Sequence, residues 1–292
     1  MFPNSNVLYV VATPIGNLED MSARAIKVLG EVDLIAAEDT RVSRILLKRY
    51  GIKTPMFSCH KFNEAKRGDF FVSKLLEGKN VALISDAGVP CISDPGHQLV
   101  ALAHKNGITV SSVCGPSSVM AALSVSGFDA SCFTFIGFFP KSGEKKKILA
   151  DMFSHGGTYV FFESPKRIKK TLALICEISN DVYTCLCNDL SKKFEKVYHG
   201  KISDVIDEVM ANDNSEKGEY TCVINSAPLP VLENEPMSIE AQIVDIMVKK
   251  NIDIKEALAE LKTQNKKLQK KQIYNAMLSL KSVVFARGKP TQ

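Results

Sequence analysis

Residues 81–96 read VALISDAGVPCISDPG, a short apolar run followed at once by a turn rich in glycine and proline. The run at 81–84 is typical of a strand that is buried on both faces. Gly88 permits backbone angles that other residues avoid, and Pro90 removes a hydrogen-bond donor, so a tight turn must follow. We therefore expect Asp86 and exposed backbone groups at the carboxyl edge of a parallel sheet, where open α/β folds bind ligands. The alternative is a plain β-to-α turn capped by an aspartate.

The same order of strand, loop and helix recurs about five times in the first half of the chain. Strand patterns occur at 7–12, 34–37, 56–58, 81–84 and 108–113, and the clearest helical patterns at 22–29, 42–49, 99–105 and 119–126. This alternation predicts an α/β domain with a mostly parallel sheet. Glycine or proline punctuates the loops at 13–17, 85–90 and 114–118, but none has the spacing of a dinucleotide-binding or Walker loop. A standard dinucleotide or nucleoside-triphosphate site is therefore not expected.

The second half has a different pattern. Strands are predicted at 133–138, 158–162, 182–187, 197–201 and 219–224, in an order closer to a meander, with a basic loop at 140–147 and helices at 148–153, 168–177 and 205–210. We expect a mixed second sheet. The segment PLPVLENEP has the composition of a linker, and three helical patterns follow it. The predicted domains are 1–116 (α/β), 117–227 (a second α/β domain), a linker at 228–236 and a helical, helix-turn-helix-like domain at 237–292.

Composition narrows the class of protein. No apolar run is long enough to span a bilayer, and the N-terminus lacks a signal-peptide pattern, so we expect a cytoplasmic protein. The eight cysteines have no metal-type spacing and are interpreted as reduced packing residues. Cys185 and Cys187 are expected to share one face of a strand.

Basic residues are unevenly distributed around a net charge of +5. Residues 262–292 contain eight lysines or arginines and no acid, and further basic groups occur at 145–147, 166–170 and 192–196. This pattern indicates a polyanionic partner, and solvated helix faces are the alternative. The candidate contacts with such a partner are Arg41, Lys145, Lys146, Lys166, Arg167, Lys192, Lys193, Lys266 and Lys270.

Several polar residues follow strands directly. Glu38 and Asp39 are adjacent at a strand end, which is costly unless they are solvated or paired, so they form either a site or a capped turn. Ser117 and Ser118 open a helix whose N-terminus favours a carboxylate or phosphate, with plain N-capping as the alternative. His60 is interpreted as either a structural or a catalytic residue.

Five motifs together resemble the tetrapyrrole methylase superfamily, over about residues 7–226. They are VATPIGNLED at 11–20, AEDTR at 37–41, SDAGVPCISDPG at 85–96, GPSS at 115–118 and FESPKR at 162–167. Within the superfamily, the chain resembles the branch that methylates the 2′-hydroxyl of a cytidine ribose in 16S rRNA, in the decoding region of the small ribosomal subunit. The resemblance implies two α/β domains with S-adenosyl-L-methionine in the cleft between them, a homodimer, and no metal.

By position, the resemblance places the donor against Thr13, Pro14, Ile15, Gly16, Ser85, Asp86, Ala87, Gly88, Val89, Ser117, Ser118, Phe162 and Cys222. A ribose hydroxyl is a poor nucleophile at neutral pH, so a nearby base is expected to accelerate its methylation. The candidates are Glu38, Asp39 and Glu163. One departure from the family pattern is Asn188, where an arginine is usual; Lys192 and Lys193 could replace that charge.

Two other functions are compatible with parts of the pattern. One is methylation of a small tetrapyrrole-like substrate, and the other is non-enzymatic nucleic-acid binding by the C-terminal helices. The lysine groups argue against a small substrate, because neutralising phosphates is the main requirement for binding a folded RNA.

Overall fold

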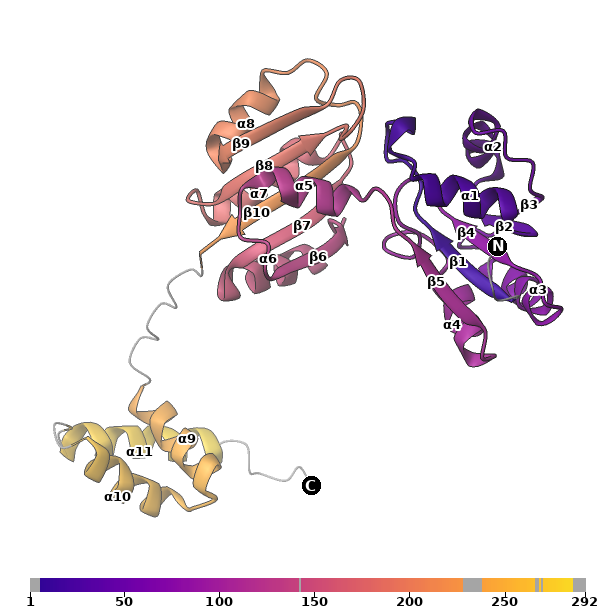
Figure 1. Cartoon of the computed structure of the whole chain (residues 1–292). Helices are drawn as coiled ribbons and strands as arrows, with labels where there is room; N and C mark the ends of the chain where they lie inside the picture. The colour runs from indigo at the N-terminus through magenta and orange to yellow at the C-terminus, as the bar shows by residue number, and fades with distance from the viewer. Residues whose placement is uncertain (1–5, 142, 228–237, 266–267, 269, 286–292) are drawn as a thin grey trace, which may run out of the picture. The chain divides into compact units, whose positions relative to one another are not determined.

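The computed structural model describes residues 6–141, 143–227, 238–265, 268 and 270–285. The chain divides into two compact units, Met1–Leu229 and Pro230–Gln292. The first unit contains two separate sheets, and the second consists of helices (Figure 1). The proposed boundary after residue 116 falls between the strands of the two sheets, and the proposed linker at 228–236 lies outside the described residues.

The first sheet is entirely parallel, with the order β3-β2-β4-β1-β5. Its strands are β1 (Val7–Val11), β2 (Leu34–Ala37), β3 (Met56–Ser58), β4 (Val81–Ile84) and β5 (Thr109–Val113). The short 3-10 helix η1 (Leu18–Asp20) follows β1, and the helices are α1 (Ala23–Glu31), α2 (Thr40–Arg49), α3 (Glu64–Leu76) and α4 (His97–Lys105). Residues of α1 and α2 pack on one face and residues of α3 and α4 on the other, which explains why β4 is buried throughout.

Parallel pairing decides where the functional loops lie. Because all five strands run in one direction, the loops that follow them meet at the carboxyl edge of the sheet. Two helices begin at this edge with the expected capping chemistry: Ser22 accepts a hydrogen bond from the Ala25 N–H, and Asp39 accepts one from the Arg41 N–H.

The second sheet is mixed, as expected, with the order β6-β7-β10-β8-β9. Its strands are β6 (Phe133–Phe138), β7 (Gly157–Glu163), β8 (Tyr183–Asn188), β9 (Lys196–Lys201) and β10 (Tyr220–Ser226). β6 and β7 are parallel and the other pairs antiparallel. The expected meander order is wrong, because β10 inserts between β7 and β8. Nearly every residue of β10 is buried, and the centre of the sheet provides that burial.

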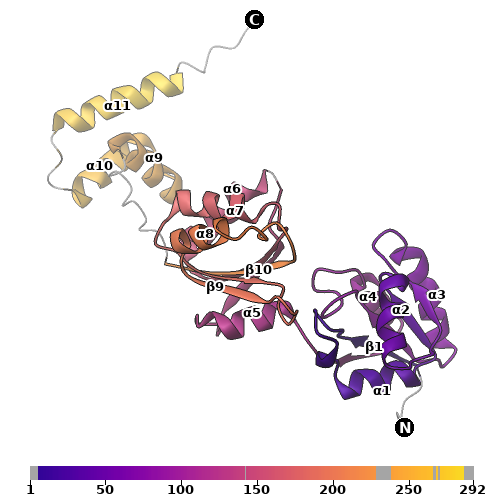
Figure 2. The same ribbon diagram turned by 90° about the horizontal axis from the view of Figure 1, so that it is seen from above.

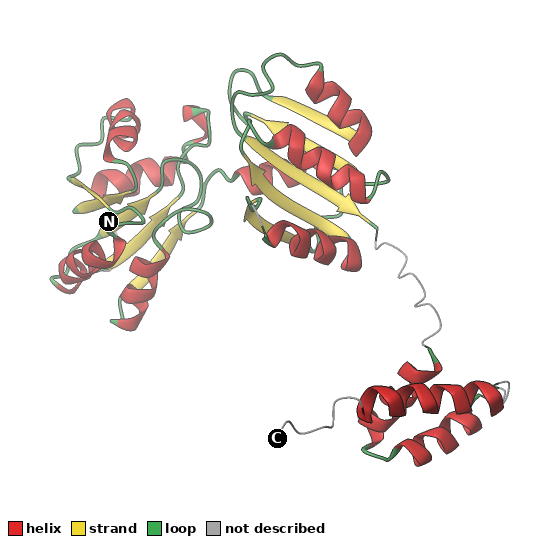
Figure 3. Ribbon diagram, turned by 180° about the vertical axis from the view of Figure 1, so that it is seen from behind, coloured by secondary structure: helices red, strands yellow, loops and turns green. Residues whose placement is uncertain are grey.

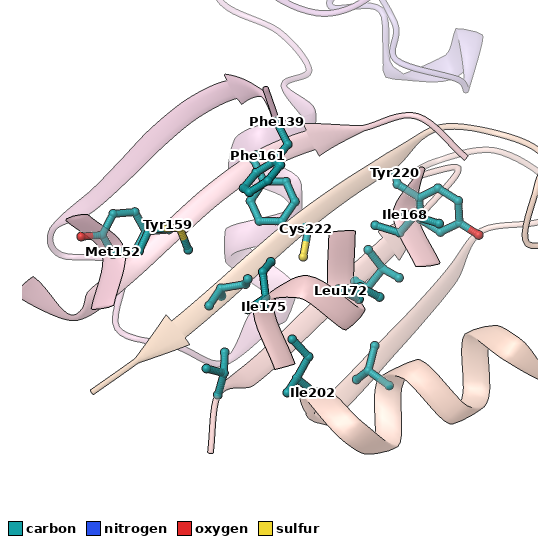
Figure 4. Packing of buried hydrophobic residues seen from close by; sticks show 14 of the residues in the cluster. Phe139, Met152, Tyr159, Phe161, Ile168, Leu172, Ile175, Ile202, Tyr220 and Cys222 are labelled. Atoms are coloured by element: carbon teal, nitrogen blue, oxygen red, sulfur yellow. The ribbon is translucent and has the colours of Figure 1, made fainter. Parts of the chain in front are cut away.

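Helices cover both faces of this sheet: α6 (Glu144–His155), α7 (Ile168–Ile178) and α8 (Ile202–Met210) on one, and α5 (Ser118–Ser126) on the other (Figure 2). Figure 4 shows part of the core under α7, where Phe161 and Cys222 meet Ile175. The basic loop expected at 140–147 requires a correction, because α6 begins at Glu144. Leu149, Met152 and Phe153 recur at helical spacing and bury one face of α6. This packing stabilises a helix that also includes the lysines at its N-terminal end.

In its described residues, the second unit has three helices that share a core of their own (Figure 3). Its helices are α9 (Ile239–Lys250), α10 (Ile254–Gln264) and α11 (Lys270–Phe285). Asp253 and Glu256 form a capping box at the N-terminus of α10. Across the described part of the chain, every helix is too short or too polar to cross a membrane.

Candidate active site

A cavity of about 340 Å³ is walled by residues from both sheets of the first unit. The first sheet contributes Ile15, Ala87, Val89, Ile92, Ser93 and Asp94. The N-terminus of α5 contributes Ser117, Ser118 and Val119, and the second sheet and its loops contribute Phe138, Phe162, Glu163, Ser164, Pro165, Leu190, Gly218, Glu219 and Tyr220. The volume lies within the range of about 300–1,000 Å³ that is usual for small-molecule sites.

Backbone hydrogen bonds fasten two of the wall loops together. The Thr13 N–H donates to the Gly88 carbonyl at 2.8 Å, the Gly88 N–H donates to the Thr13 carbonyl at 3.0 Å, and the Thr13 hydroxyl donates to the Ser85 carbonyl at 3.1 Å. Gly88 has a φ of +80°, which a residue with a side chain adopts only at a cost. Thr13 is fully buried, so it holds the loops that carry Ile15 and Ala87 instead of lining the cavity itself.

A second fastening joins the Gly16 loop to the loop after β8. The Asn17 N–H donates to the Ser191 hydroxyl at 3.1 Å. A Cβ added to Gly16 would lie 2.4 Å from Lys192 Cγ and 3.0 Å from the Leu190 carbonyl oxygen, so this close approach requires glycine. Asp189 and Ser191 have φ values of +53° and +62°, a left-handed conformation held at some cost. The result is that Leu190 forms part of the cavity wall.

Lys192 stabilises the same loop. Its Nζ lies 2.8 Å from Asp189 Oδ1 and 3.0 Å from Glu219 Oε2. The Lys192 ammonium is therefore paired with two carboxylates of the protein. The next residue, Lys193, is exposed. Lys193 lies over the ring of Phe194 at 5.5 Å.

The N-terminus of α5 presents polar groups to the cavity. Ser117 is the N-cap, and its hydroxyl accepts from the Met120 N–H at 3.5 Å. N–H groups in the first turn of a helix have no partner within the helix, and the helix dipole adds a partial positive charge. Ser118 and Val119 line the cavity at this point, so an anionic group such as a carboxylate is favoured there.

Four carboxylates lie at the carboxyl edge of the first sheet. The Asp39 N–H donates to Asp86 Oδ1 at 3.1 Å, and the Asp86 N–H donates to Glu38 Oε2 at 3.4 Å. Burial raises the pKa of Glu38, of Asp86 and of Asp94, and neighbouring carboxylates raise each further. Asp94 is the member that lines the cavity.

The pKa of Asp39 is shifted in the opposite direction. Hydrogen bonds from the Arg41 side chain and backbone lower the pKa of Asp39 to about 2. The carboxylate caps α2 and lies 2.6 Å from Arg41 Nη2. It is therefore a weak base held in a capped turn, which is one of the two alternatives expected for this position.

Glu163 lines the cavity, but its oxygens already have partners. It accepts from the Ser164 N–H at 2.7 Å and from the Thr171 hydroxyl at 2.7 Å, and it lies 3.0 Å from Arg167 Nη2. Arg167 also donates to the carbonyls of Phe139 and Pro140. The Glu163–Arg167 ion pair therefore links β7, α7 and the segment after β6, and the Arg167 guanidinium is directed at groups of the protein.

The expected donor residues fall into two groups. Ile15, Ala87, Val89, Ser117, Ser118 and Phe162 line the cavity. Thr13, Pro14, Gly16, Ser85, Asp86 and Gly88 belong to the loops that support it. Cys222 requires a correction, because its side chain is fully buried in the core on the α7 face (Figure 4). Side chains alternate along β10, and Cys222 points away from the face that α5 covers.

Sequence reasoning missed about half of the cavity wall. Ile92, Ser93 and Asp94 lie within residues 81–96, and their place after a strand-end turn was a usable signal. Gly218, Glu219 and Tyr220 stand where β10 begins, a position that depends on antiparallel pairing. The sequence around them carries no comparable signal.

The expected RNA-contact residues are spread over the chain. Lys146, Lys166 and Lys193 are exposed, and Lys145 is half-buried on α6. Lys266 lies outside the described residues, and Lys270 is the first residue of α11. His60 has a local role, since its Nδ1 accepts from the Phe62 N–H at 3.2 Å.

The fold and the cavity define a two-lobed α/β protein with a small-molecule site. Two solved structures share the fold: a cobalt precorrin-4 methyltransferase (TM-score 0.57, 18% identity, 75% of this chain and 95% of that one) and a diphthine synthase (TM-score 0.59, 13% identity, 75% and 89%). The family model Tetrapyrrole (Corrin/Porphyrin) Methylases matches residues 7–206. The chain belongs to the tetrapyrrole methylase family and uses S-adenosylmethionine as its methyl donor.

Two curated relatives have the name ribosomal RNA small subunit methyltransferase I. The protein from Thermotoga maritima is 43% identical over 218 residues, which cover 75% of this chain and 97% of the relative. The protein from Halalkalibacterium halodurans is 36% identical over 277 residues, which cover 93% of this chain and 94% of the relative. The recognition based on the five motifs is confirmed.

The residues of the cavity fit S-adenosylmethionine. Ile15, Phe162 and Leu190 provide an apolar wall suited to an adenine ring. The amide groups at Ser118 and Val119 suit the carboxylate of the methionine part, for the reasons given for the α5 N-terminus. When bound, the donor supplies a methyl group already activated by a sulfonium.

Proposed function

We propose that this methyltransferase modifies the 2′-hydroxyl of a cytidine ribose in 16S rRNA of the small ribosomal subunit. The observation that carries the proposal is the extent of the similarity, because proteins named for this ribosomal RNA match the chain at 36–43% identity and two of them over more than nine tenths of its length. The finer assignment to a cytidine 2′-oxygen in the decoding region follows from the resemblance of the five motifs.

The geometry supports transfer to a hydroxyl oxygen. A neutral hydroxyl that attacks a methyl group must lose its proton, and a positioned base assists by about 10²–10⁴-fold. Asp94 is in the cavity wall and has a raised pKa, so it holds a proton more readily than an ordinary aspartate. We assign it the role of proton acceptor, with Asp86 as the neighbouring carboxylate that raises its pKa further.

The other candidate bases are less suited to this role. Asp39 has a pKa of about 2 and is occupied by Arg41, and Glu163 already accepts from three donors. Glu38 has a raised pKa, mainly through burial, but it is not part of the cavity wall. These environments favour Asp94 over all three residues expected from the sequence.

An RNA substrate agrees with the exposed cations of the second lobe. Lys166 follows the wall residue Pro165 directly, and Lys193 lies three residues beyond Leu190. Lys145 and Lys146 are further candidates for phosphate contacts, and Lys266 and Lys270 are candidates in the helical unit. Arg41 is also a candidate, because its side chain is 87% exposed although it is paired with Asp39. Arg167 and Lys192 are better suited to holding loops, because each is paired within the protein.

Transfer of tritium from labelled S-adenosylmethionine tests the proposal. Small ribosomal subunits from cells that lack this gene should accept one methyl group, and the product should resist alkaline hydrolysis at one cytidine, because a 2′-O-methyl group blocks attack on the phosphate. Subunits from cells with the gene intact are the matched control. Label on a base instead of the ribose would contradict the 2′-O assignment, and no label in RNA would favour a small substrate.

Two further expectations belong to the same proposal. A homodimer is expected from the resemblance, and light scattering combined with size-exclusion chromatography should give twice the 32.1 kDa chain mass. Cytoplasmic location is expected for an enzyme acting on ribosomal subunits, and cell fractionation checks it. A monomer that retains full activity would contradict the first expectation.

A further inference from the structure

One exposed aromatic side chain stands at the cavity. Among the described residues, Phe62, Phe138 and Phe194 are phenylalanines that are more than half exposed, and of these Phe138 lines the cavity. Phe138 is 64% exposed, although it belongs to a strand of the second sheet. An apolar ring left in water beside an active site suggests a binding surface.

A β-bulge directs Phe138 to this position. On β6, Phe135 pairs with Val160 and Phe138 pairs with Phe162, so three steps along β6 match two along β7. The extra residue places Phe138 on the same face as Phe135, where regular alternation would place it opposite. Gly137 has a φ of +76°, a value suited to the glycine of such a bulge.

Neighbouring residues hold the ring in place. Phe139, the next residue, is buried in the core on the opposite face, beside Phe161 (Figure 4). The ring of Phe138 meets the ring of Phe162 edge to face, with centroids 5.4 Å apart and an interplanar angle of 65°. An edge-to-face contact leaves a face of one ring available for stacking.

The cavity has a buried floor and an exposed apolar rim. Glu163, Tyr220 and Val119 are less than a tenth exposed, whereas Phe138 and Ile92 are 64% and 55% exposed. The buried residues suit a donor that must be shielded from water, and the exposed ring is available to the second substrate. Phe138 comes from the second sheet and Ile92 from the loop after β4, so the rim is formed by both lobes.

We propose that Phe138 is the platform on which the base of the target nucleotide stacks while its ribose faces the cavity, an inference that rests on the proposed RNA substrate. Stacking on an aromatic ring holds a base that has left its helix, as sequence-specific RNA recognition commonly requires. It also orders the ribose, and orientation of the attacking hydroxyl contributes strongly to rate. Phe138 is thus a substrate-positioning residue, and Lys166 is suited to a flanking phosphate.

Kinetics of two variants at this position test the role. Phe138→Leu keeps an apolar side chain but removes the ring, and we expect kcat/KM for small ribosomal subunits to fall by about 5- to 100-fold, the loss of one base stack. Phe138→Trp keeps a stacking surface and should retain activity close to that of the wild type. Donor affinity should fall much less in both variants than kcat/KM does in Phe138→Leu, because Phe138 lies on the exposed rim of the cavity and the residues of its floor are unchanged.

Fluorescence supplies a second readout. The chain contains no tryptophan, so Phe138→Trp introduces a single tryptophan at the rim, which can be excited at wavelengths where the seven tyrosines do not absorb. Oligocytidylate should quench this emission, whereas the matched variant Phe62→Trp, whose side chain is 94% exposed and not part of the cavity wall, should show little change.

The outcomes are distinguishable. Equal kcat/KM for the Leu and Trp variants, or equal quenching in the Phe62 control, would overturn the inference. A loss of donor affinity with unchanged KM for the subunits would also overturn it, because Phe138 would then belong to the donor site. If the wild-type chain transfers no label to RNA, the proposed function itself fails, and the inference fails with it.

Discussion

The two sides of the cavity differ in chemistry. The first-sheet side contributes Asp94, which has a raised pKa and no ion pair among the described residues. On the second-sheet side the wall carboxylates Glu163 and Glu219 are paired with Arg167 and Lys192, and that side also presents the rings of Phe138 and Phe162, with the exposed Lys166 next to the wall residue Pro165. One side is suited to proton removal and the other to holding a polyanion with exposed bases. The difference indicates that catalysis and substrate capture can be damaged separately.

The carboxylates at the edge of the first sheet also differ from one another in pKa. The pKa of Asp94 is raised, mainly by burial, so the folded chain binds a proton there more tightly than the unfolded chain. Stability therefore falls as pH rises from the unfolded value of 3.8 through the folded value. The pKa of Asp39 is lowered to about 2, so its contribution is present above 3.8 and is lost as pH falls through 2. Asp94 weakens the fold at neutral pH, as functional groups often do.

The largest effect should follow Asp94→Asn. Loss of the proton acceptor is expected to lower kcat by about 10²–10⁴-fold. The wild-type kcat/KM should rise with pH through the raised pKa of Asp94 and then level off, and the variant should lose this step. The midpoint temperature of thermal unfolding should rise by about 1–3 °C, because the variant no longer carries a partly buried charge at this position. Asp69→Asn, at an exposed position on α3, is the control, and a variant with more than half the wild-type rate would contradict the assignment.

A smaller effect is expected from Gly16→Ala. The added methyl would lie 2.4 Å from Lys192 Cγ and 3.0 Å from the Leu190 carbonyl oxygen, and it should separate the two wall loops. Overpacking of this kind costs about 1–3 kcal/mol, so we expect donor affinity by calorimetry to fall about tenfold. Gly30→Ala is the matched control, since its methyl would meet nothing within 4 Å. Equal affinities for the two variants would show that the loop contact does not shape the site.

Neutralising the second lobe should alter RNA binding without altering the donor site. In the double variant Lys166→Ala and Lys193→Ala, the slope of log affinity against log salt should decrease by about 2, because two phosphates would no longer be neutralised by a lysine. Filter binding with 16S rRNA at several salt concentrations measures it. Lys79→Ala is the control, because that lysine is paired with Asp33 where β4 begins. An unchanged slope would show that Lys166 and Lys193 are not part of the surface that binds RNA.

The smallest effect should come from deleting residues 230–292. The first unit contains the whole cavity wall and its own cores, and the Thermotoga maritima relative has 97% of its length within a 218-residue match. Donor affinity of the 1–229 chain should stay within about twofold of the full chain. Calorimetry with S-adenosylmethionine measures it, and a large loss would mean that the helical unit takes part in the donor site.

Much of the first sheet could be predicted, because its signals are local. The strand bounds expected at 34–37, 56–58 and 81–84 agree with the structure, since buried parallel strands are continuous apolar runs between turn residues. By contrast, α6 begins four residues before its predicted start, because Glu144 and the lysines after it have no apolar periodicity.

The amino-acid sequence by itself determined the family, the parallel first sheet and the strand-end loops that line or support the cavity, because each is encoded in short runs of neighbouring residues. Only the tertiary structure decided that β10 lies at the centre of the second sheet, that Cys222 faces the core, and that Asp94, Phe138 and Tyr220 share one cavity. These depend on strand pairing and on a bulge between distant segments. Pairing between residues far apart in the chain leaves no periodic pattern in either segment alone.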